Sequence, residues 1–96
     1  MSEDCLFCQI VAGDVPSHTV YQDGTTVAFL DVNPLAKGHT LVIPKHHYET
    51  VGDLPVEEAG DLFETVRKVT PAVEAAGGAD ASTIAINNGE DSGQEI

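Results

Sequence analysis

Positive charge is scarce in this sequence of 96 residues, which has four Lys and Arg against sixteen Asp and Glu. The formal net charge of −12 at pH 7 repels nucleic-acid backbones and anionic membrane surfaces, so we expect neither as a partner. The acidic residues are spread along the chain rather than gathered in a tail. We interpret this as adaptation to high salt, where counterions screen the self-repulsion, and hence as a sign of a halophilic archaeal source. An ordinary acidic cytosolic protein is the alternative.

Long apolar runs are also missing, since no stretch approaches the roughly 18 residues that a membrane-spanning helix needs. The first four residues are acidic rather than basic, unlike the start of a secretory signal peptide. There are no internal repeats and no low-complexity linker. With 42 % hydrophobic residues, the chain is typical of one small globular domain. We therefore expect a cytoplasmic location.

The pattern of apolar residues predicts an α+β domain with an antiparallel sheet. A short N-terminal helix is expected over residues 5–12, and Gly13 would end it. A long helix over 56–76 shows apolar residues at helical spacing, with Asp53 as its cap and a kink or interruption at Pro71. Runs rich in β-branched and aromatic residues predict four strands, over 18–22, 26–30, 39–44 and 82–87.

Two cysteines and a histidine form a candidate metal site. Cys5 and Cys8 lie three positions apart on the expected N-terminal helix, so their side chains share a face. His47 follows a strand that could run back past this helix, and two thiolates with one imidazole are three of the four ligands of tetrahedral zinc. A single Cys-x-x-Cys pair is a weak signal, however, and two buried reduced thiols or a redox pair are the alternatives.

Asp31 and the loop over 87–94 are candidate nucleotide contacts. Asp31 ends a strand before a turn fixed by Pro34, so its carboxylate could accept hydrogen bonds from a ribose diol or cap the turn. The 87–94 loop is rich in Gly and small polar residues, which can turn several N–H groups towards an anion. It contains no Lys or Arg, and an ordinary polar loop remains the alternative.

The order of four motifs resembles the histidine triad (HIT) family. These are Cys-x-x-Cys at 5–8, Phe-x-Asp-x-Asn-Pro at 29–34, Gly-His-Thr-Leu-Val-Ile-Pro-Lys at 38–45 and Asn-x-Gly-x-x-x-Gly-Gln at 87–94. The resemblance covers nearly the whole chain and implies a HIT-like domain over residues 1–96. In the family, a strand of alternating histidines follows the Gly-Gln step, whereas this sequence ends there. We therefore expect a C-terminally incomplete domain without the catalytic strand.

The resemblance implies a purine nucleotide-binding hydrolase or transferase that acts at the α-phosphate of nucleoside monophosphate conjugates such as phosphoramidates. A histidine nucleophile would carry the reaction, and no catalytic residue is assigned in this chain. AMP or GMP is the expected ligand, and the complete protein resembles a homodimer. By position, the nucleotide contacts would be Leu6, Phe7, Ile10, Phe29, Leu30, Asp31, Val32, Asn87, Gly93, Gln94 and Glu95.

The resemblance also implies that zinc is held by Cys5, Cys8 and His47, with a fourth ligand from the missing region. Two other functions remain open for the chain as it stands. One is a non-catalytic nucleotide-binding module, and the other is a small interaction domain stabilised by zinc.

Overall fold

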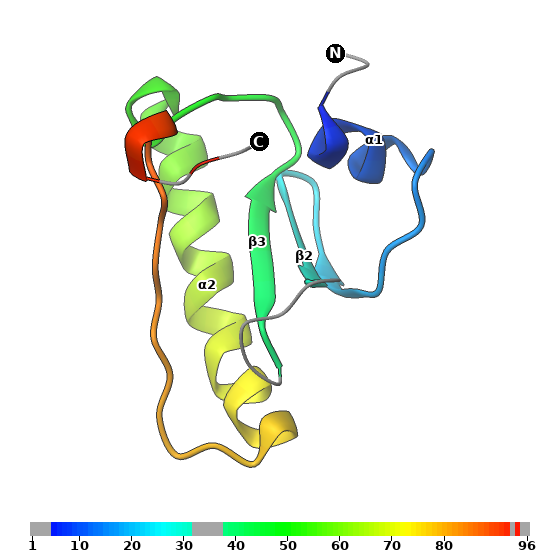
Figure 1. Cartoon of the computed structure of the whole chain (residues 1–96), viewed down its shortest axis with the longest axis vertical. Coiled ribbons are helices and arrows are strands. Elements are labelled where there is room, and N and C mark those ends of the chain that lie inside the picture. Colours follow the sequence, from blue (N-terminus) through cyan, green and yellow to red (C-terminus); the bar gives the residue numbers. More distant parts are fainter. Residues whose placement is uncertain (1–4, 32–37, 93, 95–96) are drawn as a thin grey trace.

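The computed structural model describes residues 5–31, 38–92 and 94, and it has the expected α+β architecture. Three strands form an antiparallel sheet in the order β1-β2-β3. The short helix α1 and the long helix α2 lie on opposite sides of this sheet (Figure 1). In chain order the elements are α1 (Leu6–Ala12), β1 (Thr19–Gln22), β2 (Thr26–Leu30), β3 (Thr40–Pro44), η1 (Val51–Asp53), α2 (Val56–Gly77) and η2 (Glu90–Ser92).

The central strand β2 is buried on both faces because one helix covers each face. Alternate residues of a strand point to opposite sides of the sheet. Val27 and Phe29 point to the α1 side, where they form the core with Ile43 of β3. Thr26 points to the other side and meets Thr65 of α2. The partly buried residues that complete the core on the α1 side are Phe7, Ile10, Val11 and Leu41.

Helix α1 has a defined start and a defined end. Cys5 occupies the N-cap in an extended conformation, and its Sγ accepts a hydrogen bond of 3.2 Å from the Cys8 amide. At the other end Gly13 adopts the left-handed conformation with φ of 84°, which glycine reaches without the steric cost of a Cβ. The predicted helix is therefore confirmed, with its first cysteine as the cap.

Helix α2 runs without interruption from Val56 to Gly77 with Pro71 inside it, so of the predicted kink or interruption at Pro71 the interruption does not occur. The prediction that Asp53 caps this helix is wrong. Asp53 instead forms a capping box with Thr50 around the short helix η1, and Pro55 is the N-cap of α2. No helix in the described ranges is long and apolar enough to cross a bilayer.

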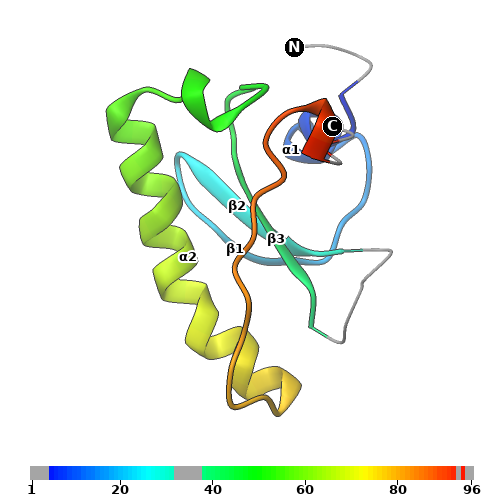
Figure 2. The same ribbon diagram turned by 60° about the vertical axis from the view of Figure 1, so that its left-hand side comes forward.

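The predicted fourth strand over 82–87 does not form, so the described part of the sheet has three strands rather than about four. This segment is exposed and pairs with no strand among the described residues, although its apolar Ile84 and Ile86 alternate as in a strand. A cavity of about 650 Å³ separates it from β3 and is lined also by α2. Figure 2 shows the segment crossing the molecule beside α2. Within the part of the chain that the structure describes, this strand-like sequence therefore has no sheet edge within hydrogen-bonding reach.

A buried hydroxyl pair joins the sheet to α2. The Oγ1 atoms of Thr26 and Thr65 lie 2.6 Å apart, and both side chains are almost fully buried. The Thr26 hydroxyl also donates a hydrogen bond of 3.2 Å to Asp23 Oδ1. Because its one proton is used there, the Thr65 hydroxyl is the donor in the bond between the two threonines. The three groups then form one directional chain of hydrogen bonds.

We expect Thr26→Val to lower the free energy of unfolding by about 1–3 kcal/mol, because it leaves the buried Thr65 hydroxyl without this partner. Thr65→Val should cost less, since Thr26 keeps Asp23 as its acceptor. Urea unfolding of both variants, with the exposed Thr19→Val as a control, measures the difference. Equal costs for the two buried substitutions would contradict the directional chain.

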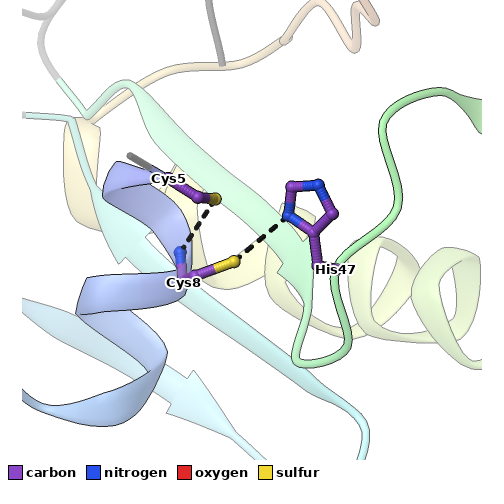
Figure 3. Close-up of side chains that lie close together, drawn as sticks. All are labelled: Cys5, Cys8 and His47. Atoms are coloured by element: carbon purple, nitrogen blue, oxygen red, sulfur yellow. Dashed lines mark hydrogen bonds between the residues drawn. The ribbon is translucent and has the colours of Figure 1, made fainter. Parts of the chain in front are cut away.

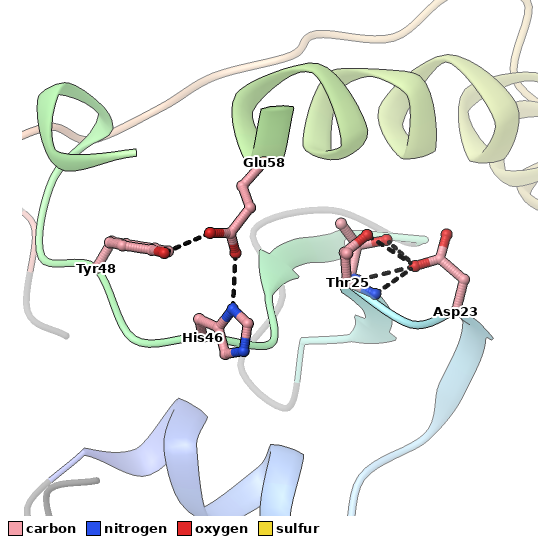
Figure 4. Close-up of polar contacts among 6 residues, drawn as sticks. Asp23, Thr25, His46, Tyr48 and Glu58 are labelled. Atoms are coloured by element: carbon pink, nitrogen blue, oxygen red, sulfur yellow. Dashed lines mark hydrogen bonds and ion pairs between the residues drawn. The ribbon is translucent and has the colours of Figure 1, made fainter. Parts of the chain in front are cut away.

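The turn between β1 and β2 is organised by the Asp23 carboxylate (Figure 4). Its Oδ1 accepts hydrogen bonds of 2.9 Å from the amides of Thr25 and Thr26, and its Oδ2 accepts one of 2.9 Å from the Tyr21 hydroxyl. These bonds favour the ionised form of the carboxylate and hold the pKa of Asp23 far below its usual range. The bond from the Thr25 amide has the largest effect on this pKa, and the bond from the Thr26 amide has the next largest.

Because the pKa of Asp23 is lower in the folded chain than in the unfolded chain, its contribution to stability is present above about pH 4. That contribution is lost as the pH falls further towards the folded-state pKa. We expect Asp23→Asn to lower the urea midpoint at pH 7 and to reduce the difference between pH 7 and pH 3. Asp61→Asn on α2 is the control, and an unchanged pH dependence in Asp23→Asn would contradict this account.

Candidate functional site

The two cysteines and His47 lie together at the N-terminal end of α1 (Figure 3). Cys5 and Cys8 are buried, whereas His47 is exposed on the loop that follows β3. The Cys8 Sγ lies 3.1 Å from the His47 Nδ1, and the two cysteines are not joined by a disulfide. Residues 39 positions apart are thus brought into one cluster, as the sequence predicts.

The geometry of this cluster fits a metal ion. One ligand atom from each of the three residues lies within 4.8 Å of the others. Tetrahedral zinc with bonds of about 2.3 Å to sulfur and about 2.0 Å to nitrogen requires ligand atoms roughly 3.5–3.8 Å apart. The distances between these ligand atoms, from 3.1 Å to at most 4.8 Å, span this range. Small side-chain movements would therefore place the three atoms at three corners of a tetrahedron. Thiolate and imidazole are also the ligands that zinc prefers.

Glu58, in the first turn of α2, holds the residues on both sides of His47 (Figure 4). Its Oε1 lies 2.9 Å from His46 Nδ1, and its Oε2 accepts a hydrogen bond from the Tyr48 hydroxyl. The hydrogen bond from Tyr48 lowers the pKa of Glu58 most, and the bond with His46 lowers it further. The hydrogen bond to Glu58 in turn raises the pKa of the Tyr48 hydroxyl. This arrangement is not apparent from the sequence, because Glu58 is ten or more positions from its partners and no spacing rule connects them.

Asp31 lies just beyond the end of β2 and is paired with His39. The Asp31 Oδ2 and the His39 Nδ1 are 3.3 Å apart, and the Asp31 amide donates to the His39 carbonyl oxygen at 3.0 Å. The Asp31 side chain keeps 21 % of its surface exposed. The Asp31 carboxylate is therefore partly accessible from solvent at the end of the central strand.

The apolar residues proposed to contact a base fall into two groups. Phe29 is buried in the core, and its ring meets Phe7 edge-on at a centroid distance of 5.8 Å. Ile10 packs against the same core. Leu6 and Leu30 are instead 40 % and 38 % exposed, so they offer apolar surface that a ligand could cover. Val32 lies outside the described residues.

The loop that follows residue 87 is fastened to the η1 region. The Gln94 side chain accepts a hydrogen bond from the Gly89 amide and donates one to the Glu49 carbonyl oxygen. The Asn88 side chain accepts one of 2.8 Å from the Val51 amide. Asn87 is exposed, while two further candidates, Gly93 and Glu95, lie outside the described residues. The Gln94 amide therefore has a structural role in ordering this loop.

Taken together, the features define a class of protein: a small α+β domain with a cysteine–histidine cluster at one end of its sheet and a partly exposed carboxylate after its central strand. A model of the HIT domain family matches residues 12–96. The chain belongs to the HIT domain family.

Several curated relatives match most of this chain. A HIT-like protein of Methanocaldococcus jannaschii is 42 % identical over 92 residues, which cover 96 % of this chain and 70 % of the relative. An adenylylsulfatase of Arabidopsis thaliana is 36 % identical over 96 residues, or 100 % of this chain and 49 % of that protein. An adenosine 5′-monophosphoramidase of Schizosaccharomyces pombe is 44 % identical over 69 residues, which cover 72 % of this chain and 52 % of that enzyme. The chain thus spans between 49 % and 70 % of the length of these relatives.

Solved structures of HIT proteins share the fold. A HIT family member from Bacillus subtilis superposes with a TM-score of 0.93 and 44 % identity, covering 98 % of this chain and 67 % of that one. A zinc-bound histidine triad protein from Mycobacterium smegmatis superposes with a TM-score of 0.90 and 36 % identity, covering 97 % and 68 %. The expected HIT-like α+β fold is therefore confirmed.

Proposed function

We propose that this chain forms the nucleotide-binding part of a HIT-family hydrolase or transferase that acts at the α-phosphate of purine nucleoside monophosphate conjugates. The family match over residues 12–96 carries the proposal. One relative is an adenylylsulfatase and another is an adenosine 5′-monophosphoramidase, and both names refer to an adenosine nucleotide. AMP is accordingly the ligand with which the proposal is tested first, and GMP is the other purine candidate.

In this proposal the carboxylate of Asp31 accepts hydrogen bonds from the ribose hydroxyls, and apolar side chains cover the base. The exposed Leu6 and Leu30 are suited to contact the base directly, while Phe29 supports them from the core. Asn87 and the loop up to Gln94 would contact the ribose and the α-phosphate through neutral dipoles. Such dipoles stabilise a phosphate without lysine or arginine, which this loop lacks.

We expect the nucleophile of the proposed reaction to be none of the four histidines of this chain. A histidine nucleophile must reach the phosphorus atom while a neighbouring group supplies protons. His18 is exposed directly before β1. His39 is paired with Asp31, His46 with Glu58, and His47 with Cys8. We therefore propose that the complete enzyme contributes its nucleophile from a further segment, and that this chain alone binds nucleotide without turnover.

We further propose that Cys5, Cys8 and His47 hold a structural zinc ion. Zinc would supply a strong cross-link between α1 and the loop after β3, and a fourth ligand or a water molecule would complete the tetrahedron. The zinc-bound structure from Mycobacterium smegmatis supports this proposal, together with the geometry of the cluster. A cytoplasmic location, a halophilic source and a homodimeric complete protein belong to the same proposal.

A calorimetric titration with AMP tests the proposed nucleotide site. We expect binding in the micromolar range and no release of AMP when adenosine 5′-phosphoramidate is incubated with this chain. Asp31→Asn should weaken AMP binding at least about tenfold, because a hydrogen bond to a charged group contributes about 1.5–3 kcal/mol. Asp61→Asn removes one carboxylate on the exposed face of α2 and should leave the affinity unchanged. The same affinity in the Asp31 variant and its control would contradict the proposal, as would no binding at all.

A further inference from the structure

The loop after β3 presents successive side chains to opposite faces of the domain. Leu41 and Ile43 of β3 contact the core on the α1 side. His47, further along the chain, also faces this side, where it contacts Cys8. His46 and Tyr48 both contact Glu58 on α2. The chain bends at Lys45 and His46, and the contacts show that His47 faces α1 while its two neighbours face α2.

Glu58 uses both carboxylate oxygens for this loop, one for each neighbour of His47. Only 17 % of the Glu58 side chain is exposed, compared with 73 % for His46. Its position in the first turn of a 22-residue helix gives the carboxylate a rigid support and a favourable dipole. His47 itself is exposed and has little packing of its own to fix its direction.

We propose that Glu58 is a positioning residue for the metal cluster: it holds both neighbours of His47 against α2 and so keeps the imidazole directed at the two thiols. This inference rests on the proposed zinc site. Glu58 does not touch the metal, and it acts through the backbone of the loop. Groups that orient metal ligands from outside typically change metal affinity by about 10–100-fold when they are removed.

Competition with a chromophoric chelator measures the zinc affinity of the 96-residue chain and its variants. Glu58→Ala should weaken zinc binding by about 10–100-fold and should alter the absorption of bound Co²⁺, which reports ligand geometry. Glu57→Ala removes the same charge from the same helical turn and should change the affinity less than about twofold. Glu58→Gln retains an oxygen that can accept from Tyr48, so it should recover part of the affinity. Equal affinities for Glu58→Ala and Glu57→Ala would overturn the inference.

Three further comparisons separate positioning from loss of stability. Thr65→Val weakens the attachment of α2 to the sheet without touching the loop, and it should leave zinc affinity unchanged. In a His47→Ala background, Glu58→Ala should have no additional effect, whereas the same loss in both backgrounds would overturn the inference. Tyr48→Phe removes a single hydrogen bond and should weaken zinc several-fold, which provides a test with minimal disturbance of folding.

The wild-type titration distinguishes failure of this inference from failure of the zinc site. If the wild-type chain binds no zinc, the proposed metal site is wrong and the role of Glu58 falls with it. If the wild-type chain binds one zinc ion and Glu58→Ala binds it equally well, the zinc site stands and only the positioning role is wrong.

Discussion

Cys8→Ser should weaken zinc binding by more than about 100-fold, the largest effect we expect from any single substitution. Cys8 is buried, and its sulfur lies 3.1 Å from the imidazole of His47, so it is at the centre of the cluster. A serine hydroxyl is a poor replacement, since zinc favours the softer thiolate and the alcohol stays protonated at neutral pH. The loss should exceed the 10–100-fold change typical of residues that only support a ligand.

Chelator competition and the sulfur-to-metal absorption of bound Co²⁺ measure this effect together. His18→Ala removes an exposed histidine outside the cluster and should leave both signals unchanged. One zinc ion bound with equal affinity by Cys8→Ser and wild type would contradict the cluster as the binding site. It would then favour the alternative that the cysteines are simply buried apolar residues.

Phe29→Ala should lower the free energy of unfolding by about 3–5 kcal/mol, the range for a large aromatic residue removed from a core. The Phe29 side chain is 3 % exposed and packs between β3 and α1, with an edge-on contact to Phe7. A domain of this size has a total stability of roughly 5–15 kcal/mol, so the variant would be close to unfolding at 37 °C. Urea unfolding monitored by circular dichroism gives the value.

Leu30→Ala is the matched comparison, because Leu30 is adjacent in sequence and 38 % exposed on the same strand. This variant should cost much less stability while weakening AMP binding. The pair therefore separates a core residue from a ligand contact. A larger loss of stability in Leu30→Ala than in Phe29→Ala would contradict the assignment of Phe29 to the core.

Most of the fold could be predicted because its signals are local. Strand β2 and helix α1 have strong apolar patterns, and Gly13 ends α1 as expected. The prediction of a strand over 82–87 was wrong because alternating apolar residues show only that a segment is able to pair in a sheet. Whether a partner edge lies beside it depends on the rest of the structure, and here a cavity separates it from β3. The predicted interruption at Pro71 does not occur, and Val69 and Val73 on either side of the proline line the same cavity, so the apolar face of α2 continues past it.

The metal cluster could be predicted because Cys5 and Cys8 share a spacing typical of ligands and because the resemblance to the HIT family implies His47 as their partner. The role of Glu58 could not, since nothing in the spacing of His46, Tyr48 and Glu58 indicates a contact. It depends on how α2 lies against the loop, which is a property of the tertiary structure. The nucleotide contacts stay a prediction, because they depend on a ligand whose position only an experiment can show.

A titration of the ¹⁵N-labelled chain with AMP, followed by amide chemical shifts, tests whether this chain binds a purine nucleotide at Asp31. We expect saturable shifts that concentrate at Leu6, Leu30 and Asp31, with smaller shifts in the loop that contains Asn87 and Gln94. The amides of the exposed face of α2, such as Glu57 and Asp61, should not move. No saturable shifts, or shifts confined to α2, would contradict the proposal that this chain carries a purine nucleotide site.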